Sequence, residues 1–300
     1  MKVYFPSYYE DFRCIADRCR HSCCVGWEID VDGETLSRYN GLDSNFGREI
    51  RSHISDDGVI GLCENGRCPF LDGRGLCRII SSLGESCISV ICREHPRFYH
   101  TAEGRTEGGI GAVCEEACRI ILSSDDYNRF TEFERDIDTP YETDFNTLVH
   151  REFIYGLLCS GDTLDYNEQL SRIREKYDLP DLTAEAEEWN KILSELEYLD
   201  ESRVGLFTVG KKDCSGEMKD YLIRFLAYLV FRHVSVAENY EDLKARVGFC
   251  LLLSAIFENM ISQRPRSFDE IVEIARTISE EIEYSEDNTA SLILEIESKI

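Results

Sequence analysis

The chain has 300 residues, of which 43% are hydrophobic, and its 58 acidic and 33 basic residues give a formal net charge of −25. This length allows one large domain or two smaller ones, each with a real core. Because nucleic-acid binding needs basic surface, the charge argues against a nucleic-acid partner. It is compatible with a basic partner, such as a lysine-bearing protein surface, or with simple solubility.

The first residues lack the apolar core and the small-residue cleavage site of a secretory signal. No stretch approaches the ~20 uninterrupted apolar residues that span a membrane. We therefore expect a cytoplasmic protein without a membrane partner. In that compartment, clustered thiols bind metal more often than they form disulfides.

The first ~125 residues are irregular and contain eleven of the fourteen cysteines. Four of these lie in CIADRCRHSCC at 14–24, with the spacing C-x4-C-x3-C-C. Alternating apolar residues predict a strand in GWEIDV at 26–31. The DGRG turn at 72–75, between CPFL and LCRII, predicts a tight hairpin or a loop around a metal. We expect helices at 34–40, at 45–54 and from near Cys114.

Beyond residue 125 the apolar residues recur with helical spacing. The segment 240–262 is apolar on nearly all sides, so it should be central, and Ser267-x-x-Glu270 is a capping box. The expected helices are 142–159, 164–177, 184–199, 216–234, 240–262, 267–284 and 288–299. The predicted fold is mainly α. An irregular cysteine-rich metal-binding region with short strands (1–125) packs on a C-terminal helical bundle (126–300).

Eight cysteines near glycines or turns form the predicted metal-binding set: Cys14, Cys19, Cys23, Cys24, Cys68, Cys77, Cys92 and Cys114. Four thiolates suit a tetrahedral zinc ion or one [4Fe–4S] cluster, and eight allow two sites, or one site with structural thiols. Their spacing matches neither paired zinc knuckles, nor the ferredoxin run, nor the C-x3-C-x2-C run of radical S-adenosylmethionine enzymes. Spacing therefore does not choose between iron–sulfur and zinc. Further candidate ligands are Cys63, Cys87, Cys118, His21 and His95.

The remaining motifs are uninformative about chemistry. The chain contains no phosphate-binding loop and no nucleophile elbow, and its glycine run at 108–112 lacks the βαβ context of a dinucleotide site. We interpret Cys159, Cys214 and Cys250 as small residues buried in or beside helices.

Several blocks resemble the flagellin lysine-N-methylase family. They are YYEDFRCIADRCRHSCCVGWEID (8–30), NGRCPFLDGRGLCRIISSLGE (65–85), CREHPR (92–97), AVCEEACRIIL (112–122) and EEIEYSEDN (280–288). The segments 14–24 and 68–92 also resemble cysteine-rich zinc- or iron-chelating proteins. Cys63 and Cys87 depart from the family's pattern, which the eight cysteines above match.

The resemblance implies a protein-lysine N-methyltransferase that acts on flagellin and uses S-adenosylmethionine and an iron–sulfur cluster. Methyl transfer needs a neutral lysine, whose ordinary pKa is about 10.4, so the site must desolvate the amine or supply a base. The sequence identifies neither that base nor the donor site; Glu94, Tyr99 and the run Tyr8–Asp11 are candidates by location only. The alternatives are a non-enzymatic module stabilised by zinc or iron, and a redox sensor that uses Cys23 and Cys24.

Overall fold

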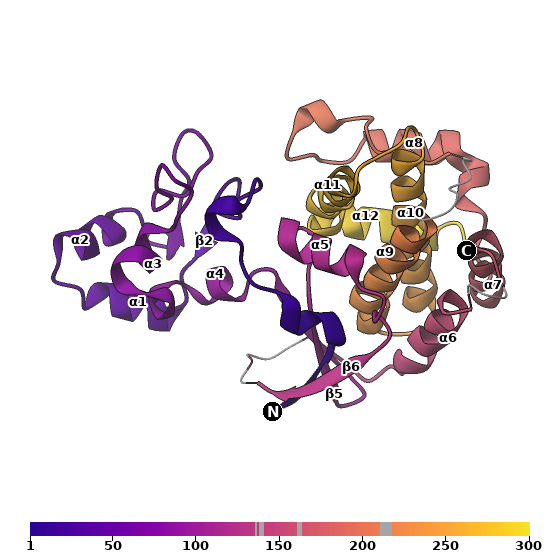
Figure 1. The fold of residues 1–300 in the computed structure, drawn as a ribbon, viewed down its shortest axis with the longest axis horizontal. Coiled ribbons are helices and arrows are strands. Elements are labelled where there is room, and N and C mark those ends of the chain that lie inside the picture. Colours follow the sequence, from indigo (N-terminus) through magenta and orange to yellow (C-terminus); the bar gives the residue numbers. More distant parts are fainter. Residues whose placement is uncertain (136, 138–140, 161–163, 211–217) are drawn as a thin grey trace. The chain divides into compact units, whose positions relative to one another are not determined.

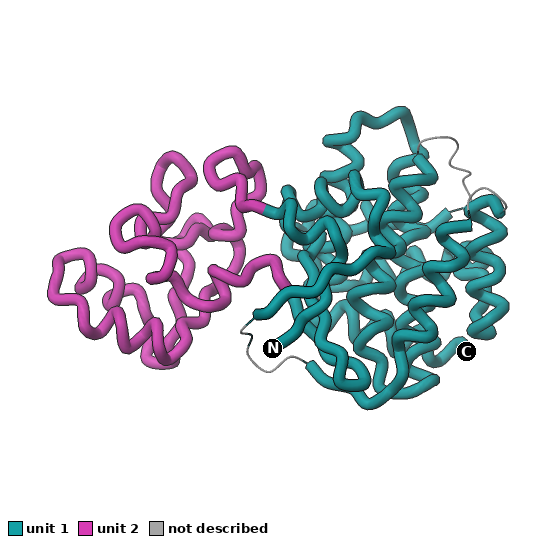
Figure 2. Tube along the Cα trace, turned by 60° about the horizontal axis from the view of Figure 1, so that its bottom comes forward, with its two compact units in different colours: residues 1–12, 98–300 teal, residues 13–97 magenta. Residues whose placement is uncertain are grey.

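The fold is described from a computed structural model, which covers residues 1–135, 137, 141–160, 164–210 and 218–300 (Figure 1). Contacts divide the chain into two compact units (Figure 2). Unit 1 contains Met1–Phe12 and Phe98–Ile300, and unit 2 contains Arg13–Arg97. Unit 2 is therefore inserted into the sequence of unit 1. That residues 1–125 and 126–300 behave as separate domains stays a prediction.

Unit 1 contains a mixed five-stranded sheet that the sequence analysis did not predict. Its strands, in the order β6-β1-β5-β4-β7, are Phe130–Glu134, Lys2–Pro6, Arg105–Ile110, Arg97–Ala102 and Tyr141–Thr143. Strand β1 pairs antiparallel with β6, where Val3 faces Phe133, and parallel with β5, where Tyr4 faces Glu107. Strands β4 and β5 are joined by Glu103 and Gly104, both with positive φ, as a two-residue hairpin turn requires.

The mainly α prediction is confirmed, since helix accounts for 54% of the described residues, and most of the helices belong to unit 1. They are α5 (Glu115–Ser123), α6 (Leu148–Leu158), α7 (Tyr166–Tyr177), α8 (Ala186–Ser194), α9 (Met218–His233), α10 (Tyr240–Ile261), α11 (Phe268–Ile278) and α12 (Glu286–Glu297). Helix α10 is buried along most of its length and packs against α9, α11 and α12 (Figure 1), so its predicted central place is confirmed. Helix α6 begins later than expected because residues 141–143 form β7.

The capping box at the start of α11 is also confirmed, since the Ser267 hydroxyl accepts from the Glu270 amide and Glu270 accepts from the Ser267 amide. Helix α11 does not reach residue 284 as a regular α-helix. It continues as a π-helix over Ser279–Glu283, a rare geometry that is frequent at functional sites.

Unit 2 contains four short helices and one two-stranded sheet. The helices are α1 (Gly33–Asn40), α2 (Asn45–Ser52), α3 (Arg78–Leu83) and α4 (Val90–Glu94), and β2 (Ile29–Asp30) pairs with β3 (Val59–Ile60). The strand expected over 26–31 is thus shortened to two residues. Its core has eight buried residues, with half-buried cysteines packed at the edge: Ile29, Val31, Tyr39, Ile50, Ile60, Phe70, Ile79 and Ile88.

In the part of the chain that the structure describes, no helix combines the length and the apolar character that crossing a bilayer requires.

Candidate functional site

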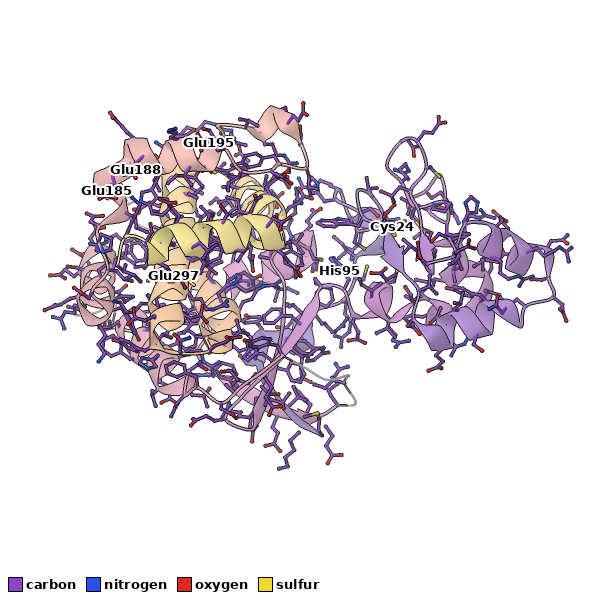
Figure 3. The ribbon with its side chains drawn as sticks, turned by 180° about the vertical axis from the view of Figure 1, so that it is seen from behind. Cys24, His95, Glu185, Glu188, Glu195 and Glu297 are labelled. Carbon is purple, nitrogen blue, oxygen red and sulfur yellow. The ribbon has the colours of Figure 1, made fainter. Side chains whose placement is uncertain are left out.

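Four of the eight predicted ligands form one group in unit 2. Cys24, Cys68, Cys77 and Cys92 are all half-buried. The thiols of Cys24, Cys77 and Cys92 each raise the pKa of Cys68, and Cys24 raises the pKa values of Cys77 and Cys92. They are therefore electrostatic neighbours, although they come from distant parts of the sequence. Figure 3 shows Cys24 among the loops of this unit.

Backbone hydrogen bonds hold the Cys24 and Cys68 segments together. The amide of Cys68 donates to the carbonyl oxygen of Cys24 at 2.8 Å. Val25 and Arg67 form an isolated antiparallel bridge, and the Gly26 amide donates to the Gly66 carbonyl at 2.8 Å. Gly26 and Gly66 both have positive φ, which suits glycine. The twin-cysteine segment is thereby fixed beside the next cysteine block.

Cys68 and Cys77 stand on either side of a hairpin. Leu71 and Cys77 form an antiparallel bridge, and one carboxylate oxygen of Asp72 accepts the amides of Arg74 and Leu76 at 2.9 Å each. This Asx-type turn explains why DGRG reverses the chain here. The tight hairpin that the sequence allowed is present, and a metal within its loop stays a prediction.

Asp32 positions the fourth cysteine. One of its oxygens caps α1 by accepting the Thr35 amide at 2.9 Å. The other accepts the Val90 amide at 2.9 Å, at the start of α4, the helix that contains Cys92. A single carboxylate therefore ties both helices, and with them Cys92, into the unit.

The thiols differ in how readily they lose a proton. A hydrogen bond with Cys23 is the main cause that lowers the pKa of Cys24 to about 7, and Ser22 and Arg67 act in the same direction. Burial is the main cause that raises the pKa of Cys68 to about 11. Burial also raises the pKa of Cys77, although the amides of Ile80 and Ile79 donate to its sulfur and oppose this.

These effects on the thiol pKa values bear on whether the four cysteines can bind a metal. As thiolates the four would repel one another, so the protonated thiols are favoured unless a cation lies between them. Amide donors to sulfur stabilise thiolates in metal and cluster sites. By residue type the four cysteines are candidate ligands for a metal or cluster. As the side chains stand, no three or more His, Cys, Asp or Glu of the described residues are grouped closely enough to hold a single ion.

The other predicted ligands are placed differently. Cys14 and Cys23 are exposed and Cys19 is half-buried, all in unit 2, whereas Cys114 belongs to unit 1, where it precedes α5. Each cysteine of the described residues is a free thiol. The expected burial of Cys250 is confirmed, but Cys159 is exposed, and Cys214 lies outside the described residues.

Unit 1 contains a buried polar network that was not predicted from the sequence. The fully buried carboxylate of Glu283, on the π-helix, accepts from the Tyr228 hydroxyl at 2.6 Å and from the Arg232 Nε at 2.9 Å. It also lies 3.2 Å from the His233 Nε2. The available signal was Arg232 and His233 at the end of an otherwise apolar helix.

A second network surrounds Glu107, whose carboxylate is fully buried between Arg151, Arg105 and His100. His100 and His233 thus have structural roles in these buried networks. Among the bases considered from sequence, burial raises the pKa of Tyr8, so its phenol stays protonated at neutral pH.

Known proteins match part of this chain. The chain is 31% identical over 134 residues to the lysine-N-methylases of Salmonella choleraesuis strain SC-B67 and Salmonella typhimurium strain LT2, which covers 40% of this chain and 32% of each relative. It is 30% identical over 134 residues to the flagellar biosynthetic protein FliU of Salmonella muenchen, which covers 77% of that protein. The chain belongs to the flagellin lysine-N-methylase family. The predicted family resemblance is confirmed.

The matched region spans about a third of the two lysine-N-methylases. No family model matches the chain, and no solved structure matches it. The two units of this lysine-N-methylase family member are therefore interpreted from their own geometry.

Proposed function

We propose that this chain is a protein-lysine N-methyltransferase that acts on flagellin, with S-adenosylmethionine as methyl donor and a [4Fe–4S] cluster on Cys24, Cys68, Cys77 and Cys92. The observation that carries the proposal is the grouping of these four thiols in unit 2 of a lysine-N-methylase family member. Zinc in the same place is the alternative metal.

The residues of unit 2 fit such a group. Cys24, with a pKa of about 7, is partly deprotonated at neutral pH and would be the first ligand to bind. The amides of Phe70, Ile79 and Ile80 donate to the sulfurs of Cys68 and Cys77 and would support their thiolate forms. When bound and ligated by all four thiolates, such a cluster would supply redox-active iron. Cys14, Cys19, Cys23 and Cys114 stay predicted ligands.

Methylation transfers a methyl group from the donor's sulfonium to the lysine nitrogen, and the ammonium of free lysine must first lose its proton. Acidic surface would attract such a cationic substrate. Unit 1 carries carboxylates on and beside α8 and α12, including Glu185, Glu188, Glu195 and Glu297 (Figure 3). Lys299 pairs with Glu188 at 2.8 Å and with Glu185 at 3.5 Å, so part of this charge is compensated.

The metal is tested on protein purified without oxygen, by measuring iron, sulfide and zinc per chain. About four irons per chain support the cluster, whereas zinc without iron overturns it. Cys68→Ser and Cys77→Ser should lower the metal content. Cys159→Ser, an exposed thiol of unit 1, is the matched control and should leave it unchanged.

The activity is tested separately, with flagellin and a labelled methyl donor under reducing conditions. Methyl-lysine that is lost in Cys68→Ser but kept in Cys159→Ser supports the proposal. The competing function is a non-enzymatic module in which metal stabilises unit 2, favoured by the unit's small core. Metal-loaded, folded protein that forms no methyl-lysine would favour that module.

A further inference from the structure

Unit 1 contains a cavity of about 290 Å³ between α6 and the sheet. Helix α6 lines it with one stripe at helical spacing, which continues to the residue that caps the helix: Leu148, Arg151, Glu152, Tyr155, Gly156 and Cys159. From the other side, Arg105 of β5, Phe130 of β6 and Asn128 complete the lining. All of these residues belong to one compact unit.

Arg151 forms a rigid cationic wall of this cavity. Its side chain is 5% exposed, and both of its terminal nitrogens bind the buried carboxylate of Glu107, one of them at 2.8 Å. Its guanidinium also lies over the rings of Phe130 and Phe231, at 4.9 and 5.3 Å from their centroids. The charge of Glu107 is therefore compensated by Arg151 within the protein.

Arg105 adds a second guanidinium, whose positive charge is not compensated by Glu107 because Arg151 already pairs with that carboxylate. Only its Nε donates to Glu107, at 2.8 Å, while its Cζ lies over the ring of Tyr4, 3.9 Å from the centroid. Among the described residues, its two terminal nitrogens form no hydrogen bond. The hydrogen bond to Glu107 and the contact with Tyr4 hold the guanidinium, and its terminal fork is left for a planar acceptor such as a carboxylate.

The rest of the lining is suited to a ligand that is largely apolar and carries no more than one negative charge. Leu148, Phe130 and the buried ring of Tyr155 are apolar surfaces. A Cβ added at Gly156 would have no heavy atom within 4 Å, so this glycine borders open space. The exposed carboxylate of Glu152 disfavours a dianion such as phosphate.

We infer that this cavity binds a small monocarboxylate with an apolar body. Arg105 holds the carboxylate through its terminal nitrogens, and Phe130 and Tyr155 contact the apolar part. The site depends neither on a metal in unit 2 nor on methyl transfer.

The test uses the full chain and benzoate, with benzamide as its uncharged isostere, and measures both by titration calorimetry. Benzoate should bind with a Kd near or below about 1 mM and at least about tenfold more tightly than benzamide, because hydrogen bonds to charged groups are the stronger ones. Equal affinities, tighter binding of inorganic phosphate, or no saturable benzoate binding would each overturn the inference.

Two variants locate the site. Gly156→Leu fills the open space without a clash and should abolish benzoate binding. Arg105→Lys keeps the charge but loses the planar fork, and should weaken binding about tenfold. Arg129→Lys is the control, because Arg129 is exposed and pairs only with Asp126 at 3.2 Å among the described residues. If folded Gly156→Leu bound benzoate with the same affinity as the wild type, the ligand would bind outside this cavity.

Discussion

The buried pair of Glu107 and Arg151 predicts a large stability loss from one isosteric substitution. The Glu107 side chain is fully buried and accepts from Arg151, from Arg105 and from His100 at 3.2 Å. Burial alone would raise the pKa of Glu107, but the hydrogen bonds from Arg151 and His100 lower it well below its ordinary value. Glu107→Gln keeps the shape and leaves the Arg151 charge buried without a counter-charge.

Breaking a buried ion pair by removing one partner costs about 3–5 kcal/mol. A unit of roughly 200 residues loses about 2–4 °C of Tm for each kcal/mol, so the Tm of unit 1 should fall by about 6–20 °C. Differential scanning calorimetry measures this directly. The matched control is Glu132→Gln, because Glu132 pairs with Lys2 at 2.8 Å on the exposed edge of the sheet, and such a pair contributes about 0–1 kcal/mol.

A double variant tests the cause. Replacing Glu107 and Arg151 together by methionine removes both buried charges and should cost less than Glu107→Gln alone. If Glu107→Gln lowered the Tm no more than Glu132→Gln, the pair would not be the buried electrostatic contact described here.

Three further predictions concern pH, metal and packing. Burial lowers the pKa values of His100 and His233, so the neutral imidazoles contribute stability to unit 1 above the unfolded histidine pKa of about 6.5. The free energy of unfolding should therefore decrease as the pH falls below about 6.5. Because the pKa of Glu107 is lowered in the folded state, its contribution should be lost as the pH falls below the unfolded glutamate pKa of about 4.3. Denaturant titrations at a series of pH values check this, and stability that rises on acidification would contradict it. Stripping metal from the purified protein should make residues 13–97 more sensitive to protease while unit 1 stays resistant, because unit 2 has only a small core; unchanged cleavage of unit 2 would contradict this. Gly111→Ala should destabilise unit 1 by about 1–3 kcal/mol, because its Cβ would clash with the Tyr284 hydroxyl. The control is Gly61→Ala, whose Cβ would meet no atom within 4 Å and therefore cause no clash in unit 2. Equal melting temperatures of both variants and the wild type would refute the clash at Gly111.

The helices could be predicted from sequence because their signals are local. Apolar spacing and the Ser267–Glu270 capping box lie within the segments that they define, and α10 is apolar on nearly all sides. The sheet of unit 1 could not be predicted in the same way. Strand β1 has five residues and pairs with residues beyond position 104, on the far side of the inserted unit 2. Nothing near it in the sequence indicates its partners.

The candidate sites show the same limit. Residue type and turn context selected eight cysteines, but which of them are neighbours depends on the Val25–Arg67 bridge and on Asp32 joining two helices. The cavity beside α6 was missed for a related reason. Arg105 and Arg151 look like solvated charges in the sequence, and only the buried carboxylate of Glu107 brings them to one cavity.

The small core of unit 2 would make a metal bound by its cysteines a source of stability for the fold. Residues 13–97 bury eight core side chains, and chains of this size with so few buried apolar residues commonly need a metal or another cross-link to fold stably. A ligand such as Cys68 would then support both the fold of unit 2 and any chemistry at the cluster. Loss of methylation in Cys68→Ser alone would not separate these roles.

Because the core of unit 1 is made of other residues, its melting transition provides the internal standard. A variant that keeps the unit 1 transition but loses that of unit 2 identifies a structural metal ligand. A variant that keeps both transitions and loses only methyl transfer identifies a residue of the reaction itself.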